Sequence, residues 1–210
     1  MNLWYQKMMV FDIDKKRPTM NLSEFYYNNL SNCQKKIYED LLICIKGFKK
    51  EVALPLVSMK TLYLIFESIL LDNPELFFID SIDFISECTK LKTMARPIYK
   101  NVINNSNFYK KHIGNSLKLF DLVKHKSDLE KVLYVHDYCI RNLKYDYSFD
   151  KLSYSVLGII INGFGVCEGI SKFVKVALNY LGVDCMVVSG DAVNHLQNSK
   201  DFQPHMWNIV

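Results

Sequence analysis

Cys167 is the residue of this chain that is best placed for covalent chemistry. It follows a glycine-rich stretch and opens a helical pattern, and His205 begins an extended segment further along the chain. A thiol attacks a carbonyl group only as thiolate, and the unpaired N–H groups and positive dipole end of a helix start favour that anion. A histidine within reach of the thiol can take its proton. The pair therefore predicts nucleophilic catalysis, with Cys167 as nucleophile and His205 as general base.

Three glycines surround the cysteine: Gly163, Gly165 and Gly169. Because they lack side chains, they permit a tight turn and let the backbone of a substrate approach closely. The first N–H groups of the helix, beginning with that of Cys167, can stabilise the oxyanion of a tetrahedral intermediate. Gly165 is therefore a candidate substrate-side position.

The residues after Cys167 form the strongest helical pattern in the chain. Apolar residues recur at helical spacing through 168–181, and Gly182 follows where a glycine commonly ends a helix. These apolar residues are Ile170, Phe173, Val174, Ala177, Leu178 and Leu181. We expect a helix here that buries this face.

Two extended segments follow, 184–189 and 205–210, with a polar loop over 190–204 between them. Successive side chains of a strand alternate between its faces, so His205 and Trp207 share one face and Asn208 lies on the other. If the two strands pair behind the helix, the imidazole can reach the thiol. Trp207 is then a candidate residue on the substrate side.

The capping-box sequence Ser127-Asp128-Leu129-Glu130 predicts the start of another helix. Its apolar stripe is Leu129, Val132, Leu133, His136, Ile140 and Leu143. His136 has two interpretations: a catalytic base, or a hydrogen-bonded core histidine that packs under the site. The pattern favours the core histidine.

Upstream, the periodicity predicts helices from Ser31, from Ser58 and over 107–124, and weak strands over 82–88 and 94–99. Pro97 suits the second strand to an edge position. We expect a mostly helical region over 1–125 and a core over 126–210, as one continuous globular unit.

Composition excludes several classes of protein. Only three of the 26 basic residues are arginine, which argues against nucleic-acid recognition. No apolar run is long enough for a membrane span and no secretory signal is visible, so we expect a cytoplasmic protein. The six cysteines form no Cys-x-x-Cys pair, which argues against zinc. Cys33, Cys44, Cys139 and Cys185 lie in apolar-periodic segments and are expected to behave as buried, reduced thiols.

The chain resembles the transglutaminase-like superfamily, in particular its bacterial transglutaminase-domain proteins. The matching motifs include Gly165-Val166-Cys167-Glu168-Gly169, Leu181-Gly182-Val183, Val188-Ser189-Gly190 and His205-Met206-Trp207-Asn208-Ile209-Val210. Upstream, His136-Asp137-Tyr138, Asn142-Leu143-Lys144-Tyr145-Asp146 and Asp72-Asn73-Pro74-Glu75-Leu76-Phe77 also resemble the family. The resemblance thus covers about residues 31–210.

This resemblance implies an α+β, papain-like cysteine-proteinase fold in which the Cys-bearing helix packs on a small antiparallel sheet. It also implies that Cys167 and His205 break an amide bond through a thioester acyl-enzyme, and that water or an amine then accepts the acyl group. Tyr154 stands where a member of the family could place a second oxyanion donor, although an aromatic residue before an apolar run is more often part of a core. Nucleophile and base are both side chains, so no metal or organic cofactor is implied.

The family places a third catalytic residue, an aspartate, on the strand after the histidine strand. The printed sequence stops at Val210, and neither Asp191 nor Asp201 matches the family position. We therefore expect a truncated chain. Three hypotheses follow: a thiol enzyme acting on peptides or proteins, hydrolytic rather than crosslinking; an impaired or inactive relative that binds peptide or protein; or a piece of an active enzyme. The sequence leaves the oligomeric state open.

Overall fold

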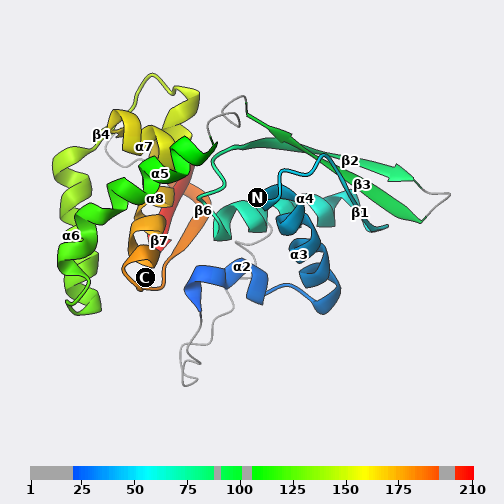
Figure 1. Cartoon of the computed structure of the whole chain (residues 1–210), viewed down its shortest axis with the longest axis horizontal. Helices are drawn as coiled ribbons and strands as arrows, with labels where there is room; N and C mark the ends of the chain where they lie inside the picture. The colour runs from blue at the N-terminus through cyan, green and yellow to red at the C-terminus, as the bar shows by residue number, and fades with distance from the viewer. Residues whose placement is uncertain (1–20, 88–90, 101–105, 194–201) are drawn as a thin grey trace. The chain divides into compact units, whose positions relative to one another are not determined.

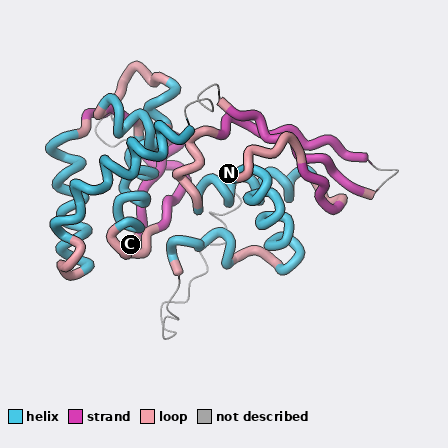
Figure 2. The backbone as a smooth tube through the Cα atoms, in the orientation of Figure 1, coloured by secondary structure: helices cyan, strands magenta, loops and turns pink. Residues whose placement is uncertain are grey.

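The structure, a computed structural model, describes residues 21–87, 91–100, 106–193 and 202–210. Contacts within the chain divide it into two units. One is Glu24–Asp121, and the other combines Met1–Ser23 with Leu122–Val210. Figures 1 and 2 show the helices and strands of each unit.

The unit Glu24–Asp121 contains the helices predicted from Ser31, Ser58 and 107–124. Each buries apolar residues of its predicted stripe, among them Ile37, Leu62 and Ile113. The helices are α2 (Phe25–Asn28), α3 (Asn32–Lys46), α4 (Met59–Asp72) and α5 (Ser106–Leu117), with the 3-10 turns η1 (Leu22–Glu24) and η4 (Lys118–Val123) at the boundaries of the unit. The helices predicted from Ser31 and from Ser58 are confirmed, and the helix predicted over 107–124 is confirmed as far as Leu117, where the 3-10 turn η4 follows.

This unit also holds a three-stranded antiparallel sheet in the order β1-β3-β2. The strands are β1 (Val52–Pro55), β2 (Ile79–Glu87) and β3 (Lys92–Tyr99). Both strand predictions are confirmed, but the edge position is wrong, because β3 lies in the middle. Pro97 is tolerated because β1 pairs only as far as Ala95, so β3 has a partner on one side alone at the proline.

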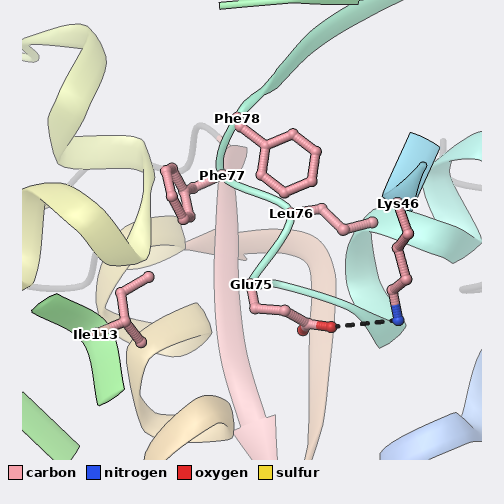
Figure 3. Close-up of a pocket in the computed structure, with 6 residues that line it drawn as sticks. All are labelled: Lys46, Glu75, Leu76, Phe77, Phe78 and Ile113. Atoms are coloured by element: carbon pink, nitrogen blue, oxygen red, sulfur yellow. Dashed lines mark ion pairs between the residues drawn. The ribbon is translucent and has the colours of Figure 1, made fainter. Parts of the chain in front are cut away.

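A pocket of about 290 Å³ lies in the same unit (Figure 3). Its lining residues are Lys46, Glu75, Leu76, Phe77, Phe78 and Ile113. Lys46 Nζ lies 3.6 Å from Glu75 Oε1 in an ion pair whose side chains are both about half exposed. Such exposed pairs contribute little stability, and the lining contains no cysteine, serine, threonine or histidine.

The second unit alternates helices with short strands. Its elements are α6 (Asp128–Asn142), β4 (Lys144–Tyr145), the 3-10 turn η5 (Lys151–Tyr154), α7 (Val156–Asn162), β5 (Phe164–Gly165), α8 (Cys167–Tyr180), β6 (Met186–Val193) and β7 (Phe202–Ile209). Helices and small sheets together make the chain α+β. Gly163, with φ of 68°, ends α7 in the left-handed conformation that glycine adopts without strain.

The predicted helix and strand pair at the end of the chain are confirmed. The apolar face of α8 is buried, and Gly182, with φ of 76°, follows its end. Strands β6 and β7 pair antiparallel, with Gly190 opposite His205. The predicted loop 190–204 starts too early, because β6 continues to Val193 and β7 already begins at Phe202. Residues 194–201 of that loop lie outside the described residues.

The predicted orientation of α6 is wrong. Leu129, Leu133 and Ile140 are 68%, 53% and 67% exposed, and the His136 side chain is 63% exposed. The helix instead turns a different face towards α8. That face includes Val135, which is fully buried, and Tyr138, whose ring centre lies 6.0 Å from that of Phe173. His136 is therefore not a core histidine.

The cysteine predictions are confirmed in part. Cys44 and Cys185 are buried and Cys139 is partly buried, but Cys33 is exposed at the start of α3. Burial raises the pKa of Cys139 and of Cys185 to about 11, so both are poor nucleophiles at neutral pH. Cys88 lies outside the described residues.

No helix among the described residues has both the length and the apolar character that crossing a membrane requires.

Candidate functional site

Cys167 is the first residue of α8, and the start of this helix differs from its neighbours. Its N-cap residue is Val166, and no side chain caps the helix. The helices α3, α4, α6 and α7 each begin after a serine whose side chain accepts a backbone N–H. The first N–H groups of α8 thus have no side-chain cap and remain available to other groups.

Two close backbone contacts hold the segment around Cys167. The N–H of Val166 donates to the carbonyl oxygen of Ser153 over 3.1 Å. A Cβ atom at Gly169 would lie 2.2 Å from that same oxygen, so only glycine fits there. Gly165 is buried in β5, where a Cβ would lie 2.1 Å from the end of the Ile159 side chain. The thiol itself is partly buried.

Tyr145 lies directly beside Cys167. Strands β4 and β5 pair in parallel and place Tyr145 opposite Gly165, two residues before the cysteine. The Tyr145 side chain lies close enough to Cys167 for the backbone and the thiol of Cys167 to influence its pKa. Burial, followed by the charge of the Cys167 thiolate, raises the pKa of Tyr145, so the hydroxyl keeps its proton and can donate.

His205 lies on β7, the strand next to α8. Asn208 fixes the two elements to each other, because its Nδ2 donates to Ser171 O of α8 over 2.9 Å and lies 3.4 Å from Cys185 Sγ. Figure 1 shows that α8 and β7 begin at the same end of the unit. Cys167 is one helical turn before Ser171, and His205 is three residues before Asn208. Both residues therefore lie between the Asn208–Ser171 contact and the end of the unit at which α8 and β7 begin.

The imidazole of His205 is exposed, and its ring centre lies 6.3 Å from that of Trp207 in a stacked arrangement. This confirms that the two residues share a face of β7. Because strand side chains alternate, that face is opposite to the one on which Asn208 contacts α8. Within the described residues, no hydrogen bond joins His205 to Cys167, so a proton transfer between them requires a different imidazole rotamer or strand position.

The transglutaminase-like superfamily model matches residues 120–210. This segment is therefore similar to that superfamily. A comparison with curated proteins found no match. The family match begins at residue 120, within η4, and does not extend to the upstream motifs of residues 31–119, whose resemblance remains a prediction.

Within the transglutaminase-like segment, Asp146 organises the loop that follows Tyr145. Its carboxylate accepts hydrogen bonds from Ser148 N over 2.9 Å, from Ser148 Oγ over 2.6 Å, from Asp150 N over 3.3 Å and from Ser153 Oγ. These bonds, led by the Ser148 hydroxyl, lower the pKa of Asp146 to about 2. Ser153 in turn accepts from Val166, so the loop supports the helix start that carries the thiol.

Tyr154 is the remaining residue predicted for the site, and Asp191 and Asp201 are the acids nearest to His205 along the chain, neither of which was predicted to match the family position. Tyr154 ends η5 with 39% of its surface exposed, and the tyrosine that meets the thiol is Tyr145. Asp191 pairs with Pro204, one residue from the Gly190–His205 pair, so its side chain is on the opposite face of the sheet from His205. Asp201 lies outside the described residues. No group of three or more His, Cys, Asp or Glu side chains in the described ranges is arranged to hold a metal ion.

Sequence reasoning missed Tyr145 as a site residue, although it had noted the segment 142–146 as part of the family resemblance. The missing step was the parallel pairing of β4 with β5, which carries Tyr145 to the position beside Cys167. A tyrosine followed by an Asx-type turn, here Asp146 with Ser148, is the local signal that could have drawn attention to it.

Proposed function

We propose that this chain supplies the catalytic cysteine and histidine of a thiol acyl-transfer enzyme that acts on amide bonds of peptides or proteins. The observation that carries the proposal is the arrangement at Cys167: a half-buried thiol at an uncapped helix start, with the Tyr145 hydroxyl beside it. The family match over this segment supports the same chemistry.

In the proposed first step, the Cys167 thiolate attacks the carbonyl carbon of the amide. The carbonyl oxygen becomes an oxyanion, which the Cys167 N–H and the protonated Tyr145 hydroxyl can stabilise. His205 takes the thiol proton and returns it to the departing amine, which leaves a thioester on Cys167. A second nucleophile then attacks the thioester and restores the thiol.

We propose water as that second nucleophile, so that the reaction is hydrolysis. Transfer to an amine requires a site that excludes water until the amine has bound. Here Cys167 is partly exposed, Tyr145 is 42% exposed and the His205 ring faces solvent. An open site of this kind favours water over a lysine side chain.

The test is labelling with a short peptide that carries an electrophilic ketone in place of the amide, followed by mass spectrometry of each cysteine. We expect Cys167 to form the adduct at least tenfold faster than Cys33, which is exposed and also lies in the first turn of a helix. Cys167→Ser removes the adduct, whereas Cys33→Ser retains it. Equal and slow labelling of both cysteines contradicts the proposal.

A second candidate is a peptide-binding relative without catalytic activity. The observation that favours it is the exposed position of His205, without a hydrogen bond to Cys167 in the described part of the chain. In that case His205→Gln leaves the rate and the pH dependence of Cys167 labelling unchanged. In the enzyme, the substitution slows labelling of Cys167 at neutral pH, because the thiol loses the base that takes its proton.

A further inference from the structure

The loop between β4 and η5 presents large aromatic side chains to solvent. Tyr147 is 81% exposed and Phe149 is 56% exposed. An exposed aromatic side chain adds almost nothing to folding stability, because its contribution comes from the area that it removes from water. The two rings are thus available for contact with a partner.

Hydrogen bonds to the Asp146 carboxylate also hold the backbone of this loop. The Asp146 carboxylate accepts hydrogen bonds from the backbone N–H groups of Ser148 and Asp150, on either side of Phe149. Phe149 has φ of 55°, in the left-handed region that side-chain-bearing residues rarely adopt. Strain of this kind persists where surrounding bonds enforce it and is concentrated at functional sites. A fixed loop loses little conformational freedom when a partner binds.

The aromatic surface is continuous with the proposed catalytic cysteine. The ring centre of Tyr147 lies 5.1 Å from that of Tyr145, in a tilted arrangement. Tyr145 in turn lies near Cys167, because the β4–β5 pair places it opposite Gly165. This ring contact therefore leads from Tyr147, in the solvent-exposed loop, to the tyrosine near Cys167.

We propose that Tyr147 and Phe149, here called the aromatic loop, form a specificity surface that binds an aromatic side chain of the polypeptide substrate next to the amide attacked by Cys167. The inference rests on the proposed function for the identity of the reacting bond. A polypeptide is the occupant because the surface adjoins a thiol suited to amides, and aromatic rings pair with other rings in offset or edge-on geometry. Each such pair contributes about two- to tenfold in affinity.

The experiment compares two electrophilic peptides that differ in one residue beside the reactive group, phenylalanine in one and alanine in the other. The readout is the ratio of their second-order labelling rates at Cys167, which cancels any effect on the thiol itself. We expect the phenylalanine peptide to react about tenfold faster with the wild-type chain. The double variant Tyr147→Ala with Phe149→Ala loses this preference, so that its ratio falls to about one.

The matched control is Leu133→Ala on α6, which removes an apolar side chain of the same unit that is about as exposed as Phe149. Its rate ratio is expected to equal that of the wild type. A double variant with an unchanged ratio overturns the proposal. So does a self-associating wild-type chain whose double variant sediments as a monomer, because a second copy of the chain would then be the occupant.

A binding measurement separates this inference from the proposed function. Cys167→Ser protein is titrated with a fluorescent, unreactive form of each peptide. In one outcome, the wild-type thiol is unreactive, but the phenylalanine peptide binds and the double variant loses that binding. The proposed chemistry then fails and the specificity surface stands. If Cys167 reacts but neither peptide is preferred in rate or affinity, the specificity surface fails alone.

Discussion

Two cysteines occupy the first turn of a helix, Cys33 in α3 and Cys167 in α8. At α3, the Ser31 hydroxyl accepts the N–H of Gln34, and the Gln34 side chain accepts the N–H of Ser31. At α8, Val166 precedes the cysteine and no side chain caps the helix. Both thiols experience the positive end of a helix dipole, but only the second lies beside N–H groups without a side-chain cap.

The surroundings of the two thiols differ as well. Cys33 is exposed to solvent, whereas Cys167 is half buried and lies near Tyr145. A helix start alone therefore does not distinguish a candidate nucleophile from a surface thiol. The distinction comes from a missing cap and from a second hydrogen-bond donor brought in by another strand.

The largest expected effect comes from removing that second donor. Tyr145→Phe deletes the hydroxyl beside Cys167 and keeps the ring, so acylation by a peptide substrate falls about 10²-fold, as for the loss of an oxyanion donor. The measurement is the single-turnover acylation rate. Tyr154→Phe is the matched control, and a loss in that variant instead of in Tyr145→Phe would favour the sequence prediction over the structure.

A backbone clash gives the next largest effect. Gly169→Ala places a Cβ 2.2 Å from the Ser153 carbonyl oxygen, which must shift together with the start of α8. We expect a loss of about 1–3 kcal/mol in the free energy of unfolding and slower labelling of Cys167. Gly114→Ala in α5 is the control. A Cβ there meets nothing within 4 Å, so equal destabilisation of both variants would refute the role of this contact.

Exchanging the caps of the two helices tests the comparison directly. Ser31→Ala removes the cap of α3 and is expected to cost about 1 kcal/mol of unfolding free energy, measured by urea denaturation. Val166→Thr offers α8 a cap of similar shape, and its hydroxyl competes for the N–H groups near Cys167. We expect Cys167 to label a few-fold more slowly in this variant. Faster labelling would show that free N–H groups are not the feature that matters.

The last effect appears only in acid. Because hydrogen bonds lower the pKa of Asp146 from 3.8 to about 2, the unfolded chain takes up a proton at Asp146 before the folded chain does. The stability that this carboxylate provides is complete above about pH 4 and is lost as the pH falls towards 2. We expect Asp146→Asn to flatten the stability curve between these values. The measurement is the thermal unfolding temperature of both proteins between pH 4 and pH 2. An equal decrease in the variant and the wild type would contradict the role of Asp146.

The sequence predicted α8 because its apolar residues recur at helical spacing. It predicted the β6–β7 pair because the two extended segments lie close to each other along the chain. It failed for α6, where the stripe containing Leu133 is exposed and a different face meets α8. A periodic stripe indicates that a helix is amphipathic, but which face packs depends on a neighbour that the pattern does not name.

The candidate site was predictable only in part. Cys167 and His205 were identified from residue type and motif, and their neighbouring elements followed from the helix and strand patterns. Tyr145 required knowledge of a two-residue parallel pair, for which no periodic signal exists in so short a strand. The rotamer of His205 likewise depends on solvent and on neighbouring side chains, which residue order does not encode.

The parallel pairing of β4 with β5 also constrains how the chain folds. Tyr145 and Cys167 can meet only after the segment from Tyr145 to Gly165, which contains η5 and α7, has closed on itself. Closing a loop of this length costs about 3 kcal/mol of chain entropy before the contacts that reward it have formed. Helix α8 can therefore form early from local interactions, whereas its thiol gains its hydroxyl partner only in a later, non-local step of folding.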